Sequence, residues 1–221
     1  MKTAVNQFIL NLSVADGVFI LGLPMIITTS LVRQWLFGSV LCKIYYIMTC
    51  VNMFTGSFTL AIMSADRFLA VYFPLRSKIY RTPRNATLVI IVTWALSFVA
   101  MTPIVMFANS VPASGRIGYY SCTIEWPVDE TSATMKIYIV YTFLLGFVVP
   151  ASAISLLYSL IVLKLRSNAV RWQRSKKRGG KAGGKDGVRR PPRRSITRLV
   201  FLIVVVYAVC WSPYWAFQVI D

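Results

Sequence analysis

Long apolar runs, separated by short charged segments, divide the whole chain. The only charge between Lys2 and Arg33 is Asp16, and no charged residue occurs in residues 44–65, 85–115, 137–163 and 199–220. About 20 helical residues cross a hydrocarbon core, so each run is long enough to span a membrane. Because lipid offers the backbone no hydrogen bonds, we predict five helices, over residues 4–32, 42–73, 84–108, 134–165 and 192–220.

The distribution of Lys and Arg along the chain predicts which segments face the cytoplasm. Lys2 and residues 66–84 and 164–198 together hold 20 basic residues, against 4 in the alternate segments. Since cytoplasmic loops are enriched in Lys and Arg, the first set is predicted to be cytoplasmic. We therefore expect a multi-pass plasma-membrane protein whose chain begins inside and ends outside.

Composition agrees with a membrane protein and disfavours several other classes. Of 221 residues, 57% are hydrophobic and only 14% are charged, which is unlike a soluble domain. The chain has no His, and its four Cys lack the spacing of metal ligands, so no metal centre of the zinc type is expected. No acid pair or nucleophile with its base is clustered, so we predict that the protein is not an enzyme.

The net charge of +17 comes mainly from one segment. Residues 164–198 contain 14 basic residues and one acid, Asp186. Nucleic-acid binding needs aromatic side chains that stack on bases, and this segment has only Trp172, so no nucleic-acid partner is expected. Its bases are instead predicted to attract anionic membrane lipid. The cytoplasmic loop 166–191 is Gly-rich in its middle, where we predict disorder.

Two of the four cysteines lie on the outer side in this topology. Cys42 precedes the second span and Cys122 lies between the third and fourth, so both face an oxidising compartment. A bond between Cys42 and Cys122 would tie the long outer loop over the mouth of the bundle. The alternative is a pair of unbonded apolar cysteines. Cys50 and Cys210 lie within spans and are expected to be free thiols.

Asp16 is the only ionisable residue deep in a predicted span. A carboxylate there costs about 3 kcal/mol on insertion scales, so it should face the bundle interior with a polar partner. Asn52 and Asn11 are amides that can complete such a site, and a Na⁺ ion or a proton would relieve the cost of burial. Apart from this Na⁺ ion, no metal or cofactor is expected. The alternative is a structural polar network without ion exchange.

Several short motifs, in order along the chain, resemble those of the rhodopsin-like G-protein-coupled receptors. They are Asn11-Leu12-Ser13-Val14-Ala15-Asp16, Asp66-Arg67-Phe68, Pro74-Leu75, Trp94, Pro150 with Tyr158, and Cys210-Trp211-Ser212-Pro213. The segment Trp35-Leu36-Phe37-Gly38 is similar to the family's first outer loop and supports the disulfide. The resemblance implies an all-α integral membrane fold in which residues 1–221 form part of a seven-helix bundle. The five spans would be family helices two to six, with helices one and seven and both tails missing.

Within that family the chain resembles somatostatin receptors and the arthropod allatostatin C receptors. The resemblance lies in Met1-Lys2-Thr3, Ser121-Cys122-Thr123-Ile124-Glu125-Trp126-Pro127, Tyr141-Thr142-Phe143 and Gly146-Phe147. Thr49 stands where somatostatin receptors carry an acid that binds the ligand's lysine, which favours an allatostatin C receptor. The resemblance then implies a disulfide-closed neuropeptide ligand and a heterotrimeric G protein of the inhibitory class. A somatostatin- or opioid-like receptor is the alternative, and a transporter or channel is the alternative from another class.

The family resemblance also implies roles for individual residues. The outer, ligand-binding set is Thr49, Met53, Thr142, Trp211, Tyr214 and Gln218. The set that couples to the G protein at the inner end is Asp66, Arg67, Pro74, Tyr158 and Arg198. The activation core that links them is Ser57, Pro150, Tyr207, Trp211 and Pro213. Arrestin and a receptor kinase are further expected partners, and ordinary helix packing is the alternative role for the aromatic and Met residues.

The sequence departs from the family pattern in three respects. Phe68 replaces the usual Tyr after Arg67, and Gly56 stands where related receptors often have a Ser in the sodium site. Ser57 and Tyr207 replace the usual apolar pair beside Pro150, so a hydrogen bond between them is expected to stabilise one arrangement of the helices.

Overall fold

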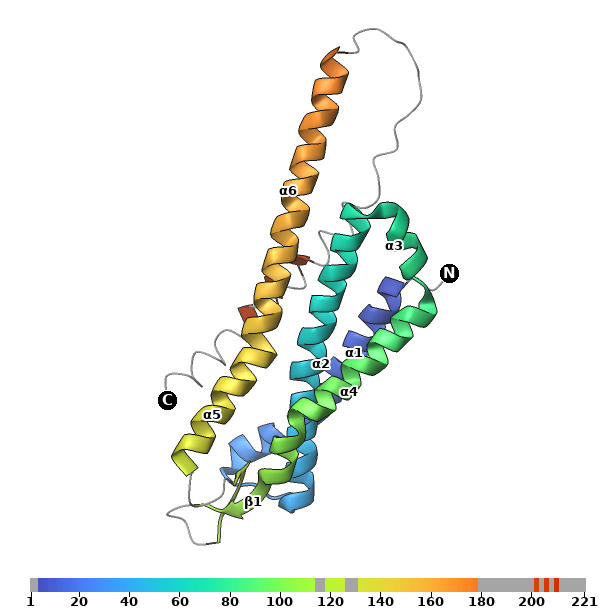
Figure 1. The fold of residues 1–221 in the computed structure, drawn as a ribbon. Coiled ribbons are helices and arrows are strands. Elements are labelled where there is room, and N and C mark those ends of the chain that lie inside the picture. The colour runs from blue at the N-terminus through green and yellow to red at the C-terminus, as the bar shows by residue number, and fades with distance from the viewer. Residues whose placement is uncertain are drawn as a thin grey trace. The chain divides into compact units, whose positions relative to one another are not determined.

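The computed structural model describes residues 4–113, 118–125, 131–178, 201–202, 205–206 and 209–210, with the side chains of 78, 131–135 and 169–178 left out. The helices and strands are shown in Figure 1. The helices are α1 (Ala4–Val32), α2 (Gly38–Tyr72), α3 (Pro74–Tyr80), α4 (Pro83–Phe107), α5 (Thr131–Phe143), the π-helical segment η2 (Leu144–Val148) and α6 (Val149–Arg178). The strands are β1 (Ala108–Pro112) and β2 (Tyr120–Ile124).

Four helical stretches among the described residues are long and apolar enough to cross a membrane. They are α1, α2, α4 and the continuous stretch Lys136–Asn168, which joins α5, η2 and α6. These stretches lie on the first four predicted spans. The fifth predicted span, residues 192–220, lies mostly outside the described residues. Helix α6 continues to Arg178, well into the basic segment that follows the fourth span.

Three elements, α3 and the strands β1 and β2, lie where charge spacing had predicted no separate structure. The segment 66–84 contains α3, in which Pro74 takes the first helical position and accepts a hydrogen bond from the Ser77 hydroxyl at 3.2 Å. The apolar run 85–115 ends as the strand β1, because the chain turns extended at Ala108, with φ −67° and ψ 125°. β1 pairs antiparallel with β2, with Ala108 opposite Ile124 and Ser110 opposite Cys122.

The chain divides into two compact units, which are described separately below. The first unit comprises Met1–Thr59 and Arg81–Pro150, and the second comprises Leu60–Tyr80 and Ala151–Asp221. The first unit therefore holds α1, α4, α5, the hairpin and the beginning of α2. The second holds the end of α2, α3 and nearly all of α6.

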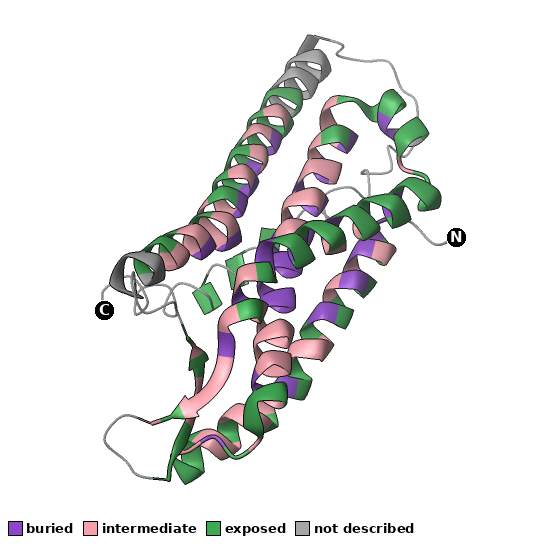
Figure 2. Ribbon diagram, turned by 60° about the horizontal axis from the view of Figure 1, so that its bottom comes forward, coloured by how far each residue is buried: buried purple, intermediate pink, exposed green. Residues whose placement is uncertain are grey.

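Helix α2 is the most buried of the four candidate spans. Inside the structure 67% of its most apolar window is buried, against 17% to 28% for the other three. Figure 2 shows that α1 and α4, which pack together, bury residues on one side and expose the other. The exposed sides carry large apolar side chains such as Leu31, Leu21 and Val99. Such residues are expected on a lipid-facing surface, where apolar exposure carries no cost.

Buried polar side chains connect α1, α2 and α4 within the first unit. The Asn11 amide donates to the Thr59 hydroxyl at 3.0 Å and accepts from the Trp94 indole at 2.7 Å. Nearby along α2, the Thr55 hydroxyl donates to the Ser97 hydroxyl at 2.9 Å. Because hydrocarbon offers no alternative partner, these hydrogen bonds fix how the three helices face one another. In this structure the Asn11 amide thus bonds both α2 and α4.

In the second unit, α2 and α6 each bury a stripe of side chains. The buried apolar residues of this part of α2 are Leu60, Met63 and Ala70, and those of α6 are Ile154, Tyr158 and Ile161. The α6 residues recur at intervals of four and three, which places them on one face of the helix.

Candidate functional site

One end of the first unit is closed by a disulfide. Cys42, at the start of α2, is bonded to Cys122 on β2, with 5.6 Å between their Cα atoms. Cys50 is a free, buried thiol and Cys210 a free thiol, as predicted. The predicted pairing of Cys42 with Cys122 is confirmed, and it anchors the hairpin to the beginning of α2.

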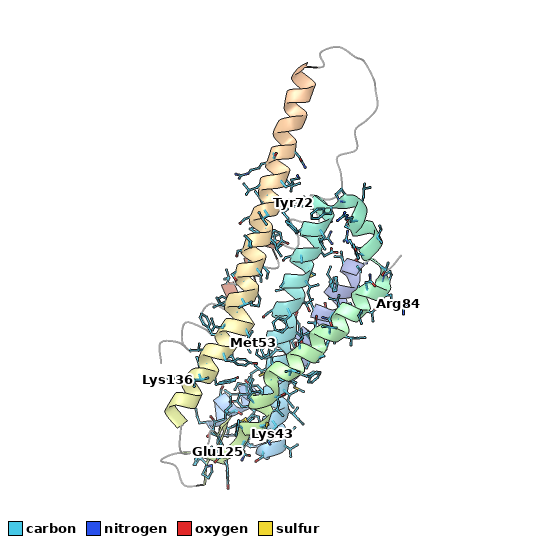
Figure 3. All side chains as sticks on the ribbon, in the orientation of Figure 1. Lys43, Met53, Tyr72, Arg84, Glu125 and Lys136 are labelled. Atoms are coloured by element: carbon cyan, nitrogen blue, oxygen red, sulfur yellow. A yellow bond between two sulfur atoms is a disulfide. The ribbon has the colours of Figure 1, made fainter. Side chains whose placement is uncertain are left out.

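Trp35 adds a second attachment between this end of α2 and the hairpin. Its backbone N–H donates to the carbonyl of Tyr120 on β2 at 2.8 Å, and its indole N–H donates to the carbonyl of Gly38 at 2.8 Å. The side chain is buried, and its ring packs edge-on against Phe37. In Figure 3, Lys43 and Glu125 lie at this end of the unit and Arg84 lies at the other end. That separation agrees with the predicted orientation, in which Lys43 and Glu125 are outer and Arg84 is cytoplasmic.

The predicted ligand-binding residues of the described region lie on α2 and α5. The Thr49 hydroxyl donates to the carbonyl of Tyr45 at 3.0 Å, one turn back in its own helix. Thr142 is buried and donates to the carbonyl of Tyr138 at 2.9 Å. Both hydroxyls are thus satisfied by backbone and bring no charge to this region. Trp211, Tyr214 and Gln218 lie outside the described residues, as does Arg198 of the inner set.

Met53 contacts the fourth apolar stretch at a glycine. A Cβ atom added to Gly146 would lie 3.4 Å from both Cγ and Sδ of Met53, which is tighter than ordinary packing. The lack of a side chain at Gly146 therefore makes room for the buried Met53 thioether. Gly146 is one helical turn beyond Thr142, so Met53 and Thr142 belong to the same region of the first unit.

The predicted sodium site is only partly assembled. The Asn52 amide donates to the Asp16 carboxylate at 2.7 Å, so the expected polar partner is present. Asp16 itself is exposed within this chain, whereas the sequence predicted that it faces the interior. A cation would find one carboxylate and one amide, since Gly56 has no side-chain oxygen and no group of three or more acidic or Cys ligands occurs among the described residues. These residues fit a Na⁺ ion incompletely, and its binding stays a prediction.

The residues around Pro150 show how a proline is accommodated inside an apolar helix. In an α-helix the N–H of residue 150 would donate to the carbonyl of Gly146, but proline has no N–H and its ring crowds that carbonyl. The backbone instead widens into η2, and the N–H of Val149 bonds to the carbonyl of Leu144, five residues back. The Ser57 hydroxyl of α2 donates to the carbonyl of Gly146 at 2.7 Å.

Ser57 thus offers the Gly146 carbonyl a donor from another helix, although the same hydroxyl also lies within hydrogen-bonding distance of the Met53 carbonyl in its own helix. The sequence predicted a bond from Ser57 to Tyr207, which lies outside the described residues. The importance of Gly146 was not predicted, although the signal was present: a proline four residues after any carbonyl in a span leaves that carbonyl without its helical donor.

The predicted inner residues lie in the second unit. An Arg67 guanidinium nitrogen is 3.5 Å from an Asp66 carboxylate oxygen, with side chains only 8% and 11% exposed. Tyr158 is buried, packs edge-on against Phe201 at 5.7 Å and has Ser64 and Arg67 as polar neighbours. Within the described residues its hydroxyl has no partner in hydrogen-bonding geometry. Pro74 begins α3 and is exposed.

Comparison with known proteins identifies this arrangement. Residues 1–221 match the rhodopsin family of seven-transmembrane receptors. The chain is 42% identical over 179 residues to somatostatin receptor type 4 of Rattus norvegicus, covering 80% of this chain and 46% of that protein. It is 39% identical over 178 residues to somatostatin receptor type 2 of Mus musculus, and 40% identical over 178 residues to type 5 of Bos taurus. Each of these matches covers 80% of this chain and 47% of the relative, so the chain spans about half the length of the curated relatives it matches.

The described residues combine apolar helices long enough to cross a membrane with a hairpin that a disulfide anchors in the first unit and an Asp-Arg pair in the second unit. The chain belongs to the rhodopsin family of seven-transmembrane receptors, and within it is similar to somatostatin receptors. The predicted family, the partial seven-helix fold, the multi-pass plasma-membrane location and the assignment as a receptor rather than an enzyme are thereby confirmed.

We predict that Cys42→Ser and Cys122→Ser in the full-length receptor each abolish surface binding of a disulfide-closed peptide of the predicted ligand class, because each removes the covalent bond between the hairpin and α2. Cys50→Ser is the matched control and should bind normally, since its thiol is unbonded. The measurement is saturation binding on intact cells, normalised to surface receptor. Normal binding by both single variants would show that the hairpin keeps its position without the bond.

We also predict that Ser57→Ala destabilises the full-length receptor, because the carbonyl of Gly146 loses a donor that lipid cannot replace. One net hydrogen bond is worth about 0.5–1.5 kcal/mol, which corresponds to a fall of roughly 1–6 °C in the midpoint of thermal unfolding in detergent. Ser159→Ala is the control, because that hydroxyl donates to Ser155 in its own helix. An equal midpoint for wild type and Ser57→Ala would contradict this assignment.

Proposed function

We propose that this chain is part of a G-protein-coupled neuropeptide receptor whose ligand is a disulfide-closed peptide of the allatostatin C type. The observation that carries the proposal is that the proposed ligand-binding wall, made of Thr49, Met53 and Thr142, carries no charge. In the first unit, both threonine hydroxyls are bonded to their own helices and Met53 is buried against Gly146. A peptide with an uncharged residue at its deepest point suits this wall.

A ligand lysine would be poorly accommodated at that wall. An ammonium group that leaves water loses several kcal/mol of hydration after relaxation, and only a nearby carboxylate offsets such a loss. Glu125 is the nearest described acid on the hairpin, and it is engaged by the Asn109 amide at 3.3 Å. The somatostatin-like alternative is favoured by the identity to somatostatin receptors, so the two ligand classes must be separated by experiment.

We infer that the inner end activates a heterotrimeric G protein, of the inhibitory class by family resemblance. Arg67 carries five N–H donors in a rigid fork, and here Asp66 engages one of its nitrogens. If the helix ends separate, that fork becomes available to backbone carbonyls of an inserted partner helix. Pro74, Tyr158 and Arg198 are the further residues proposed for this coupling.

A ligand at the outer end can act on the inner end only by preferring one helix arrangement over another. Helix α2 carries Thr49 and Met53 in its first half and Arg67 near its end, so both proposed sites include residues of one helix. Ser57 and Pro150 lie on the proposed activation core, together with Tyr207, Trp211 and Pro213. A Na⁺ ion at Asp16 and Asn52 would favour one arrangement in the same way.

Other proposed partners meet the cytoplasmic side. The basic residues at the end of α6, from Lys164 to Arg178, suit anionic lipid of the inner leaflet, at about 1 kcal/mol for each base near the surface. Arrestin and a receptor kinase are further proposed partners, as expected for this family. Membership of a receptor family removes the transporter and channel alternative.

We predict that Arg67→Ala in the full-length receptor retains peptide binding but loses nucleotide exchange on the G protein. The reason is that Arg67 lies near the end of α2, whereas the proposed ligand-binding residues of this helix, Thr49 and Met53, lie in its first half. The measurement pairs peptide affinity with ligand-stimulated exchange on a purified inhibitory-class G protein, and Arg84→Ala, an exposed arginine of α4, is the control. A parallel loss of affinity and exchange would mean that Arg67 serves folding instead.

We predict that Thr49→Asp weakens the response to an allatostatin C-type peptide and improves the response to a somatostatin-type peptide with a central lysine. The new carboxylate would offset the free-energy cost of dehydrating the ligand's lysine, and it would weaken the binding of an apolar residue at the same place. The measurement is a paired dose-response of both peptides on wild type, Thr49→Asp and the uncharged control Thr49→Asn. A wild type that already prefers the lysine peptide refutes the allatostatin C assignment.

A further inference from the structure

The last residue of α2 carries a side chain that contacts α6 twice. In the second unit, the Tyr72 hydroxyl donates to the carbonyl of Leu160 at 3.1 Å. The ammonium nitrogen of Lys164 lies 5.2 Å from the centroid of the same ring, within the range of a cation–π interaction. Figure 3 shows Tyr72 at the end of α2. These three residues are called the Tyr72 clamp below.

The geometry of both helices explains why one ring meets both partners. Leu160 and Lys164 are four residues apart on α6, so they share one face of that helix. Phe68 is one turn before Tyr72 on α2, and the two rings stack with centroids 4.4 Å apart. Phe68 therefore holds the Tyr72 ring in place from its own helix, while the hydroxyl and the ring face bind α6.

The clamp lies close in sequence to the proposed coupling residues. Phe68 directly follows Arg67, and the clamp is formed in the same arrangement in which Asp66 engages Arg67. Movement of α6 away from the end of α2 would have to break the hydroxyl bond and separate Lys164 from the ring. The clamp thus opposes the helix separation through which a partner would reach Arg67.

We propose that Tyr72 is a positioning residue that holds the cytoplasmic ends of α2 and α6 together and restrains the receptor in its resting arrangement. This inference rests on the proposed coupling to a G protein. The carbonyl of Leu160 already has its helical donor, the N–H of Lys164, in a regular helix. Removal of the Tyr72 hydroxyl therefore strands no buried acceptor, and the effect should fall on the equilibrium between arrangements rather than on folding.

Tyr72→Phe tests the clamp most sharply, because it removes one oxygen and keeps both the stack on Phe68 and the ring under Lys164. Ligand-free nucleotide exchange by the full-length receptor should rise about two- to tenfold, the range given by one net hydrogen bond. Lys164→Met should raise it about two- to fivefold by removing the cation. Tyr80→Phe, an exposed tyrosine on α3, is the matched control and should leave the basal rate unchanged.

A second measurement tests the clamp without a G protein, through the distance between α2 and α6. Nitroxide labels at Leu69→Cys and Arg166→Cys, both exposed positions, report the separation of α2 and α6 by double electron–electron resonance. Cys50 and Cys210 are replaced by Ser beforehand. The labelled receptor should give a single short distance, and the same receptor carrying Tyr72→Phe should populate a longer one.

The two measurements distinguish failure of the clamp from failure of the proposed function. An unchanged distance distribution in Tyr72→Phe overturns the clamp, whatever the exchange assay shows. A longer distance with no exchange by any variant, with or without peptide, supports the clamp and contradicts G-protein coupling. A longer distance with an unchanged or lower basal exchange, in a receptor that peptide still activates, overturns the proposal that the clamp restrains activation.

Discussion

The inability of lipid to form hydrogen bonds is the constraint on which the rest of this structure depends. Every polar group inside a span must find its partner in protein, and four such hydrogen bonds among the described residues join α2 to another helix. In the first unit, the Asn11 amide donates to the Thr59 hydroxyl, Thr55 donates to Ser97, and Ser57 donates to the carbonyl of Gly146. In the second unit Tyr72 bonds the carbonyl of Leu160. Each bond joins α2 to another helix, which is why α2 is buried while its neighbours expose apolar faces.

These bonds differ in how they resist movement. The Asn11 amide donates to Thr59 of α2 and accepts from Trp94 of α4, so it connects three helices at once. Loss of both bonds would leave this amide without partners in hydrocarbon. Tyr72 bonds the carbonyl of Leu160, which keeps its own helical donor, so this bond can break without leaving an acceptor unpaired. A receptor needs both kinds of contact, because some helices must keep their packing while others change arrangement. The structure thus separates a fixed polar network from contacts that can be released.

Charge spacing predicted the long helices because it measures the length of chain that can lie in lipid. It could not find the strand β1, since Ala108–Pro112 is as free of charge as the helix before it and differs only in backbone conformation. It could not find α3, because a seven-residue helix carries too little periodicity to stand out in a basic segment. The disulfide was predicted because both cysteines share one compartment. The roles of Gly146 and Tyr72 were missed because each depends on a contact between residues more than 85 positions apart.

The central claim is that peptide binding at the disulfide-bonded end and G-protein binding near Arg67 act on one equilibrium. Thermodynamic linkage then requires the G protein to raise the affinity for peptide by the same factor by which peptide raises the affinity for the G protein. The direct measurement is the dissociation constant of a disulfide-closed allatostatin C-type peptide for the full-length receptor in lipid discs, with and without nucleotide-free inhibitory-class G protein. The account predicts tighter peptide binding, by about 5- to 150-fold, when the G protein is present. Equal affinity under both conditions would contradict it.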